Sequence, residues 1–301
     1  MKPKFEIVKN FKIFGIVAIL FVIVGLAGLI LLPFGVNLFN FGVDFVGGTT
    51  MHIALHTQVG DAEVAKVEQI VEEVTSKPAS SVVRTGDGTE VQISTLDIPT
   101  ETRDEIFEQL KAEYNLSDSD RLNVENVSAS VGKDLQLAAV FSAFLAIVLM
   151  LAYITIRFEF KSGLAAVCTL THDLLVMLSV YIIFRIPMDM NFIAAALTIL
   201  GYSINASIIV FDRVRENRRF SGKASFDEVV EQSIWQTLMR TVNTTLTTLF
   251  PIVMLYIFGV SSIKNFALPL IVGVVAGGYS SAFLAGPLWT KFRKLGRKKA
   301  A

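Results

Sequence analysis

The sequence is poor in the residues that build disulfide frameworks and soluble catalytic sites. It has one cysteine, Cys168, and three histidines among 301 residues. One cysteine excludes an internal disulfide. There is also no H-E-x-x-H, no glycine-rich loop followed by Lys-Ser/Thr, and no G-x-S-x-G nucleophile elbow. We therefore expect no enzyme, no cofactor and no metal site. An intramembrane protease has only the pair His172-Asp173 in its favour.

What the chain has in place of such motifs is apolar sequence. Hydrophobic residues make up 52% of it and the mean hydropathy is +0.57, which is too apolar for a soluble chain of this length. A membrane-spanning helix needs about 20 mostly apolar residues. Six stretches qualify, so we predict a membrane α-helical protein with six transmembrane helices: 11–32, 137–156, 162–184, 191–211, 241–258 and 265–290.

The net charge of zero conceals an uneven distribution. Residues 33–136 contain 18 Asp and Glu against 7 Lys and Arg, whereas the rest of the chain contains 9 acidic and 20 basic side chains. Basic residues accumulate in the cytoplasmic segments of membrane proteins. We therefore predict cytoplasmic termini and an extracytoplasmic block at 33–136. No A-x-A cleavage pattern follows the first apolar stretch, so 1–32 is expected to be a cytoplasmic N-terminus and a retained first helix.

The extracytoplasmic block has the pattern of an α+β domain. A β-rich run at 49–55 precedes a helical pattern at 60–74, for which Asp61 is a plausible cap. Two β runs then flank Gly86-Asp87-Gly88, a strong hairpin signal, and a second helical pattern leads to an alternating strand near 121–130. The order β-α-β-β-α-β predicts a ferredoxin-like domain between the first two transmembrane helices.

The remaining segments complete the domain prediction. Residues 137–290 form the five-helix remainder of the transmembrane domain, and 291–301 form a basic cytoplasmic tail. For that tail, anionic lipid is a better partner than nucleic acid. The connection at 212–239 alternates apolar and polar residues. It is either an amphipathic helix on the membrane surface or a helix that packs beneath the bundle.

Two ionisable groups fall within apolar stretches and are candidates for ion coupling. Asp173 lies near the middle of the third stretch, beside His172. A charged side chain there costs at least about 2.5–3.5 kcal/mol, so it must face the bundle interior or water. Asp173 either carries protons or only locks helices together through hydrogen bonds. Arg240 starts the fifth stretch, as an interfacial anchor or as part of a polar seam with three hydroxyls: Thr241, Thr244 and Thr245.

Small and polar residues predict how the last helices pack. Gly201 and Asn205 stack on one side of the fourth stretch, and Ser203 and Ser207 stack on another. We expect Gly201 to permit a close helix approach, Asn205 to need a polar partner, and this helix to be central. In the sixth stretch, small residues four apart predict a second close approach: Gly273, Gly277, Ser281 and Ala285.

Several motifs together resemble the SecF family, the smaller halves of the bacterial SecDF protein-export accessory factors. They are FGVDFVGGT, RFEF, THD, GYSIN with IIVFDRVREN, QTLMRTVNTTLTTL and FALPLIVGVVAGGYSSAFLAGPL, and the resemblance covers essentially the whole chain. It implies a six-helix half of the resistance-nodulation-division (RND) superfamily fold in the bacterial cytoplasmic membrane. It also implies a SecD partner, the SecYEG channel, YajC and YidC as further partners, a translocating preprotein, and use of the ion gradient in late steps of export.

One position departs from the family pattern. An acidic residue commonly follows the asparagine of GYSIN, whereas this chain has Ala206. Three explanations are open: the intramembrane acid of SecD carries the ion alone; the ion is Na⁺, bound by Asn205, Ser203 and threonine hydroxyls; or the coupling is lost or the alanine engineered. Ala206 also favours a second hypothesis, a non-conducting scaffold that stabilises SecD and the channel while SecD alone carries the ion. A lipid or drug exporter of the same superfamily fits less well, because such exporters usually carry twelve spans in one chain.

Overall fold

The computed structural model describes residues 6–79, 81–85 and 88–298. The chain divides into two compact units. The helical unit comprises Met1–Asn40 and Val140–Ala301, and the α+β unit comprises Phe41–Ala139. The sequence placed the α+β block at 33–136, so its start lies eight residues later than predicted and its end three residues later.

Long apolar helices build the helical unit. Within the described ranges, six helices are long and apolar enough to cross a membrane, as the six apolar stretches predicted. The main helices and short elements of this unit are α1 Phe11–Leu31, η1 Leu32–Phe34, α5 Ala129–Arg157 (which starts in the other unit), α6 Phe160–Ile183, β6 Pro187–Met188, α7 Met190–Phe220, α8 Phe226–Phe258, α9 Ser261–Ser280, η4 Ser281–Ala285 and α10 Gly286–Lys298.

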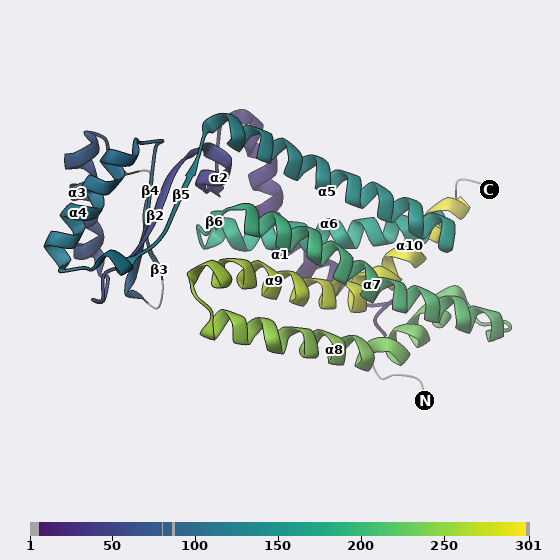
Figure 1. Ribbon diagram of the computed structural model, residues 1–301. Coiled ribbons are helices and arrows are strands. Elements are labelled where there is room, and N and C mark those ends of the chain that lie inside the picture. The colour runs from purple at the N-terminus through teal and green to yellow at the C-terminus, as the bar shows by residue number, and fades with distance from the viewer. Residues whose placement is uncertain (1–5, 80, 86–87, 299–301) are drawn as a thin grey trace. The chain divides into compact units, whose positions relative to one another are not determined.

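Helix α9 is the centre of this bundle, in contact with α6, α7 and α8 (Figure 1). Two glycines allow the close approach. A Cβ atom on Gly273 would lie 2.5 Å from Cγ1 of Ile199, and one on Gly277 would lie 3.1 Å from Cβ of Ser203. Helix α7 is therefore held against α9 at a distance that larger residues at these two positions would not permit.

The segment around 226–239 is not a separate helix on a membrane surface. It is the first part of α8, which runs without a break from Phe226 to Phe258, and the turn before it spans only 221–225. Ser225 caps the helix by accepting a hydrogen bond from the amide of Glu228. Val230 and Ile234 are buried in the core of the bundle. The segment packs against the bundle because this contact removes its apolar side chains from water.

The sixth apolar stretch also differs from a simple span and tail. Helix α9 ends at Ser280, a single π-helical turn follows at Ser281–Ala285, and α10 continues as far as Lys298. The predicted basic tail is therefore helical over 291–298. Residues 299–301 lie outside the described residues.

The α+β unit contains a four-stranded antiparallel sheet with α3 and α4 on one side of it (Figure 1). The strand order is β3-β4-β2-β5, and the predicted β-α-β-β-α-β order is present. Met51, Ile53 and Ile93 are buried in the core of this unit. The bounds are β1 Asn40–Phe41, α2 Val43–Val46, β2 Gly48–Ala54, α3 Asp61–Thr75, β3 Ser81–Thr85, β4 Glu90–Thr95, α4 Thr100–Tyr114, η3 Asp118–Asp120 and β5 Arg121–Val127.

Two local details of this unit concern the start of α3 and the start of β2. Asp61 is the first residue of α3 and not its cap; Gly60 precedes the helix, and its amide donates to Oε2 of Glu63. Gly48, the first residue of β2, has φ +138°, and a Cβ atom there would lie 2.3 Å from the carbonyl oxygen of Thr95, so the start of this strand requires glycine. Residues 86 and 87 of the predicted hairpin lie outside the described residues.

Asp120 makes the turn before β5 sensitive to acid. Its carboxylate accepts hydrogen bonds from the amide of Ser117 at 2.7 Å and lies 2.8 Å from Nε2 of His56. The backbone amide first, and then His56, lower the pKa of Asp120 from 3.8 to about 2. A lowered folded-state pKa stabilises the fold above the unfolded pKa, and this stabilisation is lost as pH falls through about 2.

Asp120→Asn is therefore expected to speed amide hydrogen exchange around Ser117 at pH 5, because the charged acceptor is gone. The difference from wild type should shrink as pH falls toward 2, where the wild-type carboxylate is itself protonated. Hydrogen-exchange mass spectrometry on the full chain, comparing both proteins at each pH, measures this. Asp97→Asn is the control on an exposed carboxylate of the same unit. An Asp120→Asn difference that persists unchanged at pH 2 would contradict the assignment.

Candidate functional site

A fully buried carboxylate lies at the centre of the helical unit. Asp173 of α6 has no exposed surface. Its Oδ2 accepts a hydrogen bond from Oγ of Ser203 on α7 at 2.5 Å, and another from Oγ of Ser280 on α9 at 2.9 Å. One side chain thus joins three helices. We refer to Asp173, His172, Ser203 and Ser280 as the Asp173 cluster.

His172 is the second titratable group of this cluster. Its Nδ1 lies 2.9 Å from Oδ1 of Asp173, and its ring stacks on Tyr279 with centroids 6.1 Å apart. Among the described residues, its buried Nε2 has no hydrogen-bond partner. Tyr279 in turn donates its hydroxyl to the carbonyl oxygen of Phe14 on α1 at 2.8 Å. The cluster is therefore connected to α1 through two aromatic rings.

The geometry of the cluster suits two roles. Three polar neighbours offset the cost of burying a carboxylate, so Asp173 fastens α6, α7 and α9 together. The serine hydroxyls can rotate, and imidazole can carry a proton on Nδ1. The Nδ1 atom of His172 and Oδ1 of Asp173 are therefore close enough to share a proton.

The second group of predicted residues lies on an exposed face. A Cβ atom on Gly201 would lie more than 4 Å from every described atom outside the backbone of α7, and Asn205 is exposed. Gly201 therefore makes no close helix contact within this chain, and α7 is central on its Ser203 side only. The sequence could not separate these faces, because the two stacks are equally small and polar.

The stretch of α8 that is apolar enough to cross a membrane is mostly exposed: only 6% of its residues are buried within this chain. Arg240 and Thr244 are on its exposed surface, and the hydroxyl of Thr244 donates to the carbonyl of Arg240. Thr245 faces inward and accepts a hydrogen bond from the hydroxyl of Tyr202 at 3.1 Å, which connects α8 to α7. Thr241 is buried, and its Oγ1 has no hydrogen-bond partner among the described residues.

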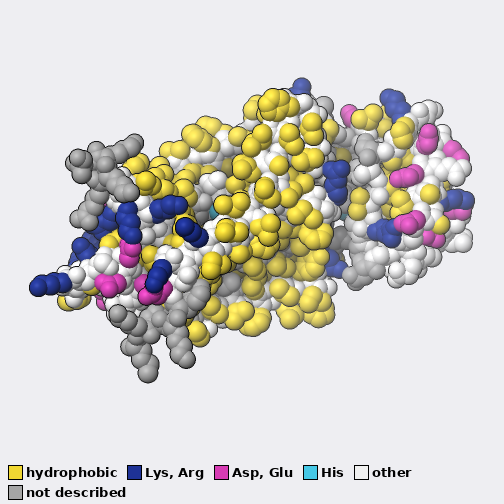
Figure 2. Space-filling view, turned by 180° about the vertical axis from the view of Figure 1, so that it is seen from behind, with side chains coloured by type: hydrophobic (Ala, Val, Ile, Leu, Met, Phe, Trp, Pro, Cys, Tyr) yellow, Lys and Arg dark blue, Asp and Glu magenta, His cyan; other side chains and the backbone are white. Residues whose placement is uncertain are grey.

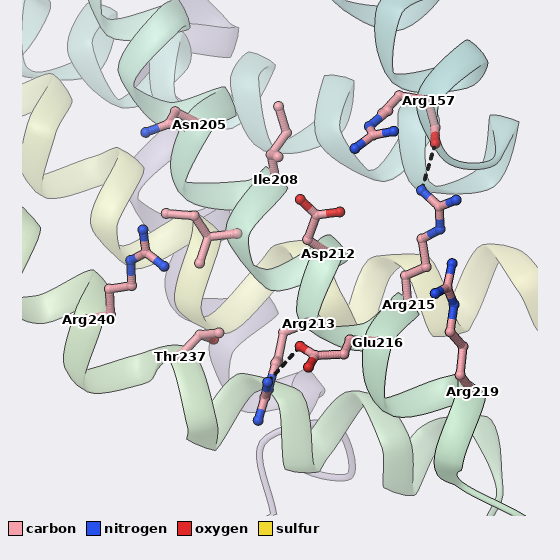
Figure 3. A pocket seen from close by; sticks show the side chains of 11 residues that line it. Arg157, Asn205, Ile208, Asp212, Arg213, Arg215, Glu216, Arg219, Thr237 and Arg240 are labelled. Atoms are coloured by element: carbon pink, nitrogen blue, oxygen red, sulfur yellow. Dashed lines mark hydrogen bonds and ion pairs between the residues drawn. The ribbon is translucent and has the colours of Figure 1, made fainter.

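An open groove of about 690 Å³ lies between the ends of α5, α7 and α8 (Figure 3). Asn205 and Arg240 line it together, whereas the Asp173 cluster does not. The residues predicted to take part in ion coupling or in a polar seam therefore fall into two groups. The buried group centres on Asp173, and the exposed group follows the outer surfaces of α7 and α8 into the groove.

Several residues of these contacts were not named as candidates from the sequence. Ser280 lies in a GGYSS run of small and hydroxyl residues, but the sequence does not show that its hydroxyl meets Asp173. Ser281, which was a packing candidate, is buried and donates to the carbonyl of Gly278. Gly25 was missed as well; its amide donates to Oγ of Ser179 on α6 at 2.8 Å. Among the described residues, no three His, Cys, Asp or Glu side chains cluster as metal ligands do.

Comparisons with known proteins agree on one family. The family model described as "Protein export membrane protein SecD/SecF, C-terminal" matches residues 106–295. Curated relatives named "Protein translocase subunit SecF" are similar over nearly the full length. The one from Acidaminococcus fermentans is 39% identical over 97% of this chain and 98% of its own, and the one from Alicyclobacillus acidocaldarius is 33% identical over 100% and 96%.

Larger proteins match over part of their length. "Protein translocase subunit SecDF" of Bacillus subtilis is 36% identical over 90% of this chain, which covers 36% of it. The crystal structure of SecDF from Thermus thermophilus, described as a translocon-associated membrane protein, superposes with a TM-score of 0.84 at 31% identity. It matches 97% of this chain, and this chain spans 39% of that SecDF chain.

The two relatives above that match at nearly full length are SecF subunits, and the solved relative is a membrane protein of the same fold. The six apolar helices agree with these matches. The chain is therefore a membrane protein that belongs to the SecF branch of the SecD/SecF family.

Proposed function

We propose that this chain is the SecF-type subunit of a protein translocase and that it uses the transmembrane ion gradient to promote late steps of preprotein export. The observation that carries the proposal is the Asp173 cluster. A carboxylate with no exposed surface is held by hydroxyls of two other helices in a chain of this family. Such buried carboxylates mark ion and proton paths in membrane proteins.

The names of the relatives supply the partners of this proposal. A SecDF chain contains a SecF-like part and a further part, which supports a separate SecD subunit as the partner of this chain. One relative is described as translocon-associated, which supports the SecYEG channel as a second partner. YajC and YidC remain further candidates from the family resemblance. We place the protein in the bacterial cytoplasmic membrane with both termini inside, because the basic residues outside 33–136 favour that orientation.

The mechanism we propose is conformational. Ion passage between the SecF and SecD halves changes the protonation and hydrogen bonding of the Asp173 cluster, and the movement of α6, α7 and α9 is transmitted to the α+β unit outside the membrane. That unit then restrains backward movement of the emerging polypeptide. Its β-α-β-β-α-β order supports assignment to the ferredoxin-like class, and the six helices support an RND-type half. No enzymatic step is part of the proposal.

Asp173→Asn and Arg240→Gln test this mechanism. Asparagine keeps the size and one acceptor oxygen of Asp173 but cannot exchange a proton. We expect gradient-stimulated preprotein export in inverted membrane vesicles to fall to the level measured without a gradient, while ATP-driven export stays unchanged. Asp97→Asn and Arg218→Gln remove the same charges away from the Asp173 cluster and the groove, and should leave export unchanged. Full gradient stimulation in both test variants would remove these residues from the mechanism.

A non-conducting scaffold is the alternative function, and Ala206 is the observation that favours it. The position is half-buried and has no carboxylate, so SecD would supply the ion-carrying group. Ala206→Asp distinguishes the two. A rise in gradient-stimulated export in that variant supports coupling through this chain. Export that depends on neither residue 206 nor Asp173 nor Arg240 supports the scaffold.

A further inference from the structure

We propose that the groove between α5, α7 and α8 binds the phosphate headgroup of an anionic membrane phospholipid. Three arginines at one side of the groove, Arg157, Arg215 and Arg219, form what we call the arginine triad (Figure 3). The proposal does not depend on the proposed export function, because it concerns a ligand and not the coupling ion.

The triad comes from two helices that meet at the end of the bundle. Arg157 is the last residue of α5, and Nη1 of Arg215 on α7 donates to its carbonyl oxygen at 3.4 Å. Arg219 lies four residues after Arg215, on the same side of α7. Figure 3 shows the three side chains at the same side of the groove that they line. Guanidinium groups in such a cluster can bind phosphate oxygens in bidentate fashion.

No acidic side chain in the described part of the chain forms an ion pair with the triad. Glu216, which follows Arg215 on α7, is bound to Arg213 at 2.6 Å. Asp212 points into the groove but forms no ion pair with any described residue. Like charges four residues apart on a helix repel each other, and here a third cation is added. An external anion would relieve this repulsion. The carboxylate of Asp212 would lower the affinity of the groove for that anion, because the two carry charges of the same sign.

The surroundings of the triad identify the anion as a lipid. Ile156, the neighbour of Arg157, is 87% exposed, and Tyr153 one turn earlier is 56% exposed. Only 11% of the residues in the membrane-spanning stretch of α5 are buried. The exposed side of α5 is therefore an apolar surface that leads directly to Arg157. In Figure 2, Lys and Arg side chains gather at an end of the apolar band of the helical unit. Acyl chains can lie along α5 while the phosphate reaches the triad, an arrangement that a soluble phosphate cannot use.

The test is lipid binding by the full-length chain purified in detergent, measured by native mass spectrometry. Titrations use dioleoylphosphatidylglycerol, the zwitterionic dioleoylphosphatidylcholine, and inorganic phosphate. We expect wild type to prefer phosphatidylglycerol. The triple variant Arg157→Gln, Arg215→Gln, Arg219→Gln should lose about 100-fold in affinity, at roughly five-fold for each arginine. Asp212→Asn should bind more tightly, since it removes a repelling charge from the groove.

The matched control removes three positive charges elsewhere: Lys9→Gln, Arg218→Gln and Lys223→Gln, none of which lines the groove. It should bind phosphatidylglycerol as wild type does. Equal affinity for the two lipids, or unchanged binding by the triple variant, would overturn the proposal. Displacement of lipid by millimolar phosphate would assign the site to a soluble anion. If the triple variant loses a co-expressed SecD subunit but not lipid, the triad binds a protein carboxylate, and the lipid proposal fails.

Discussion

Gly25→Leu is expected to prevent α1 from docking on α6 and to destabilise the helical unit by about 3 kcal/mol. Among the described residues of α1, only Ala18, Gly25 and Gly28 are buried. A Cβ atom on Gly25 would lie 2.5 Å from the carbonyl oxygen of Leu175. That oxygen belongs to a helix backbone and cannot rotate away, so the helices must separate, at the upper end of the cost of overpacking.

The change would also disturb a polar contact. The amide of Gly25 donates to Oγ of Ser179, which itself donates to the carbonyl of Leu175. Separation of the helices breaks the bond between Gly25 and Ser179 in an apolar environment, which adds to the steric cost, whereas the bond from Ser179 to Leu175 lies within α6 and is kept. We expect an apparent melting temperature in detergent about 5 °C or more below that of wild type, and reduced accumulation in the membrane.

Gly15→Leu is the control for the Gly25 prediction, because it makes the same substitution in the same helix. Apart from the backbone of α1 itself, the only described atom within 4 Å of a Cβ atom at Gly15 would be Cζ of Phe11, at 3.9 Å. Both substitutions gain the same helix propensity over glycine, about 1 kcal/mol, so a difference between them reports packing. Equal melting temperatures for the two variants would show that α1 does not need the close approach at Gly25.

The fold was largely predictable because its two main signals are local. Six apolar stretches of sufficient length predicted six helices, and alternation with helical spacing predicted the order of strands and helices in the α+β unit. The extent of α8 was not predictable. The segment at 226–239 is amphipathic in either of its two interpretations, and its burial against the bundle depends on residues far away in the sequence.

The candidate site was predictable in type but not in pairing. A carboxylate inside an apolar stretch identified Asp173, since its cost requires polar neighbours. Which neighbours supply the hydrogen bonds depends on the rotation of each helix about its axis. Ser203 and Asn205 are two residues apart, yet one is buried against Asp173 and the other is exposed in the groove. The spacing of small residues predicted the close helix contacts at Gly273 and Gly277. Gly25 and Gly28 were not predicted as contacts, because they lie three residues apart in an otherwise apolar run.

Glu231→Ala is expected to free the segment that precedes α1 from the bundle. The carboxylate of Glu231 on α8 accepts hydrogen bonds from the amides of Ile7 at 2.8 Å and Val8 at 2.7 Å. Hydrogen bonds to a charged acceptor contribute about 1.5–3 kcal/mol each. Loss of both should increase local opening by about 10²- to 10⁴-fold, and amide hydrogen exchange at Ile7 and Val8 should accelerate by the same factor.

The same carboxylate accepts the indole N–H of Trp235 at 2.8 Å, so the indole emission of Trp235 should also change in Glu231→Ala. Glu231→Gln keeps one acceptor oxygen and should give an intermediate rate. Gln232→Ala, one residue along and exposed, serves as the control and should exchange as wild type does. Ile7 is itself only 1% exposed, so its apolar contacts provide a second attachment. Unchanged protection of Ile7 and Val8 in Glu231→Ala would show that these contacts hold the segment without the carboxylate.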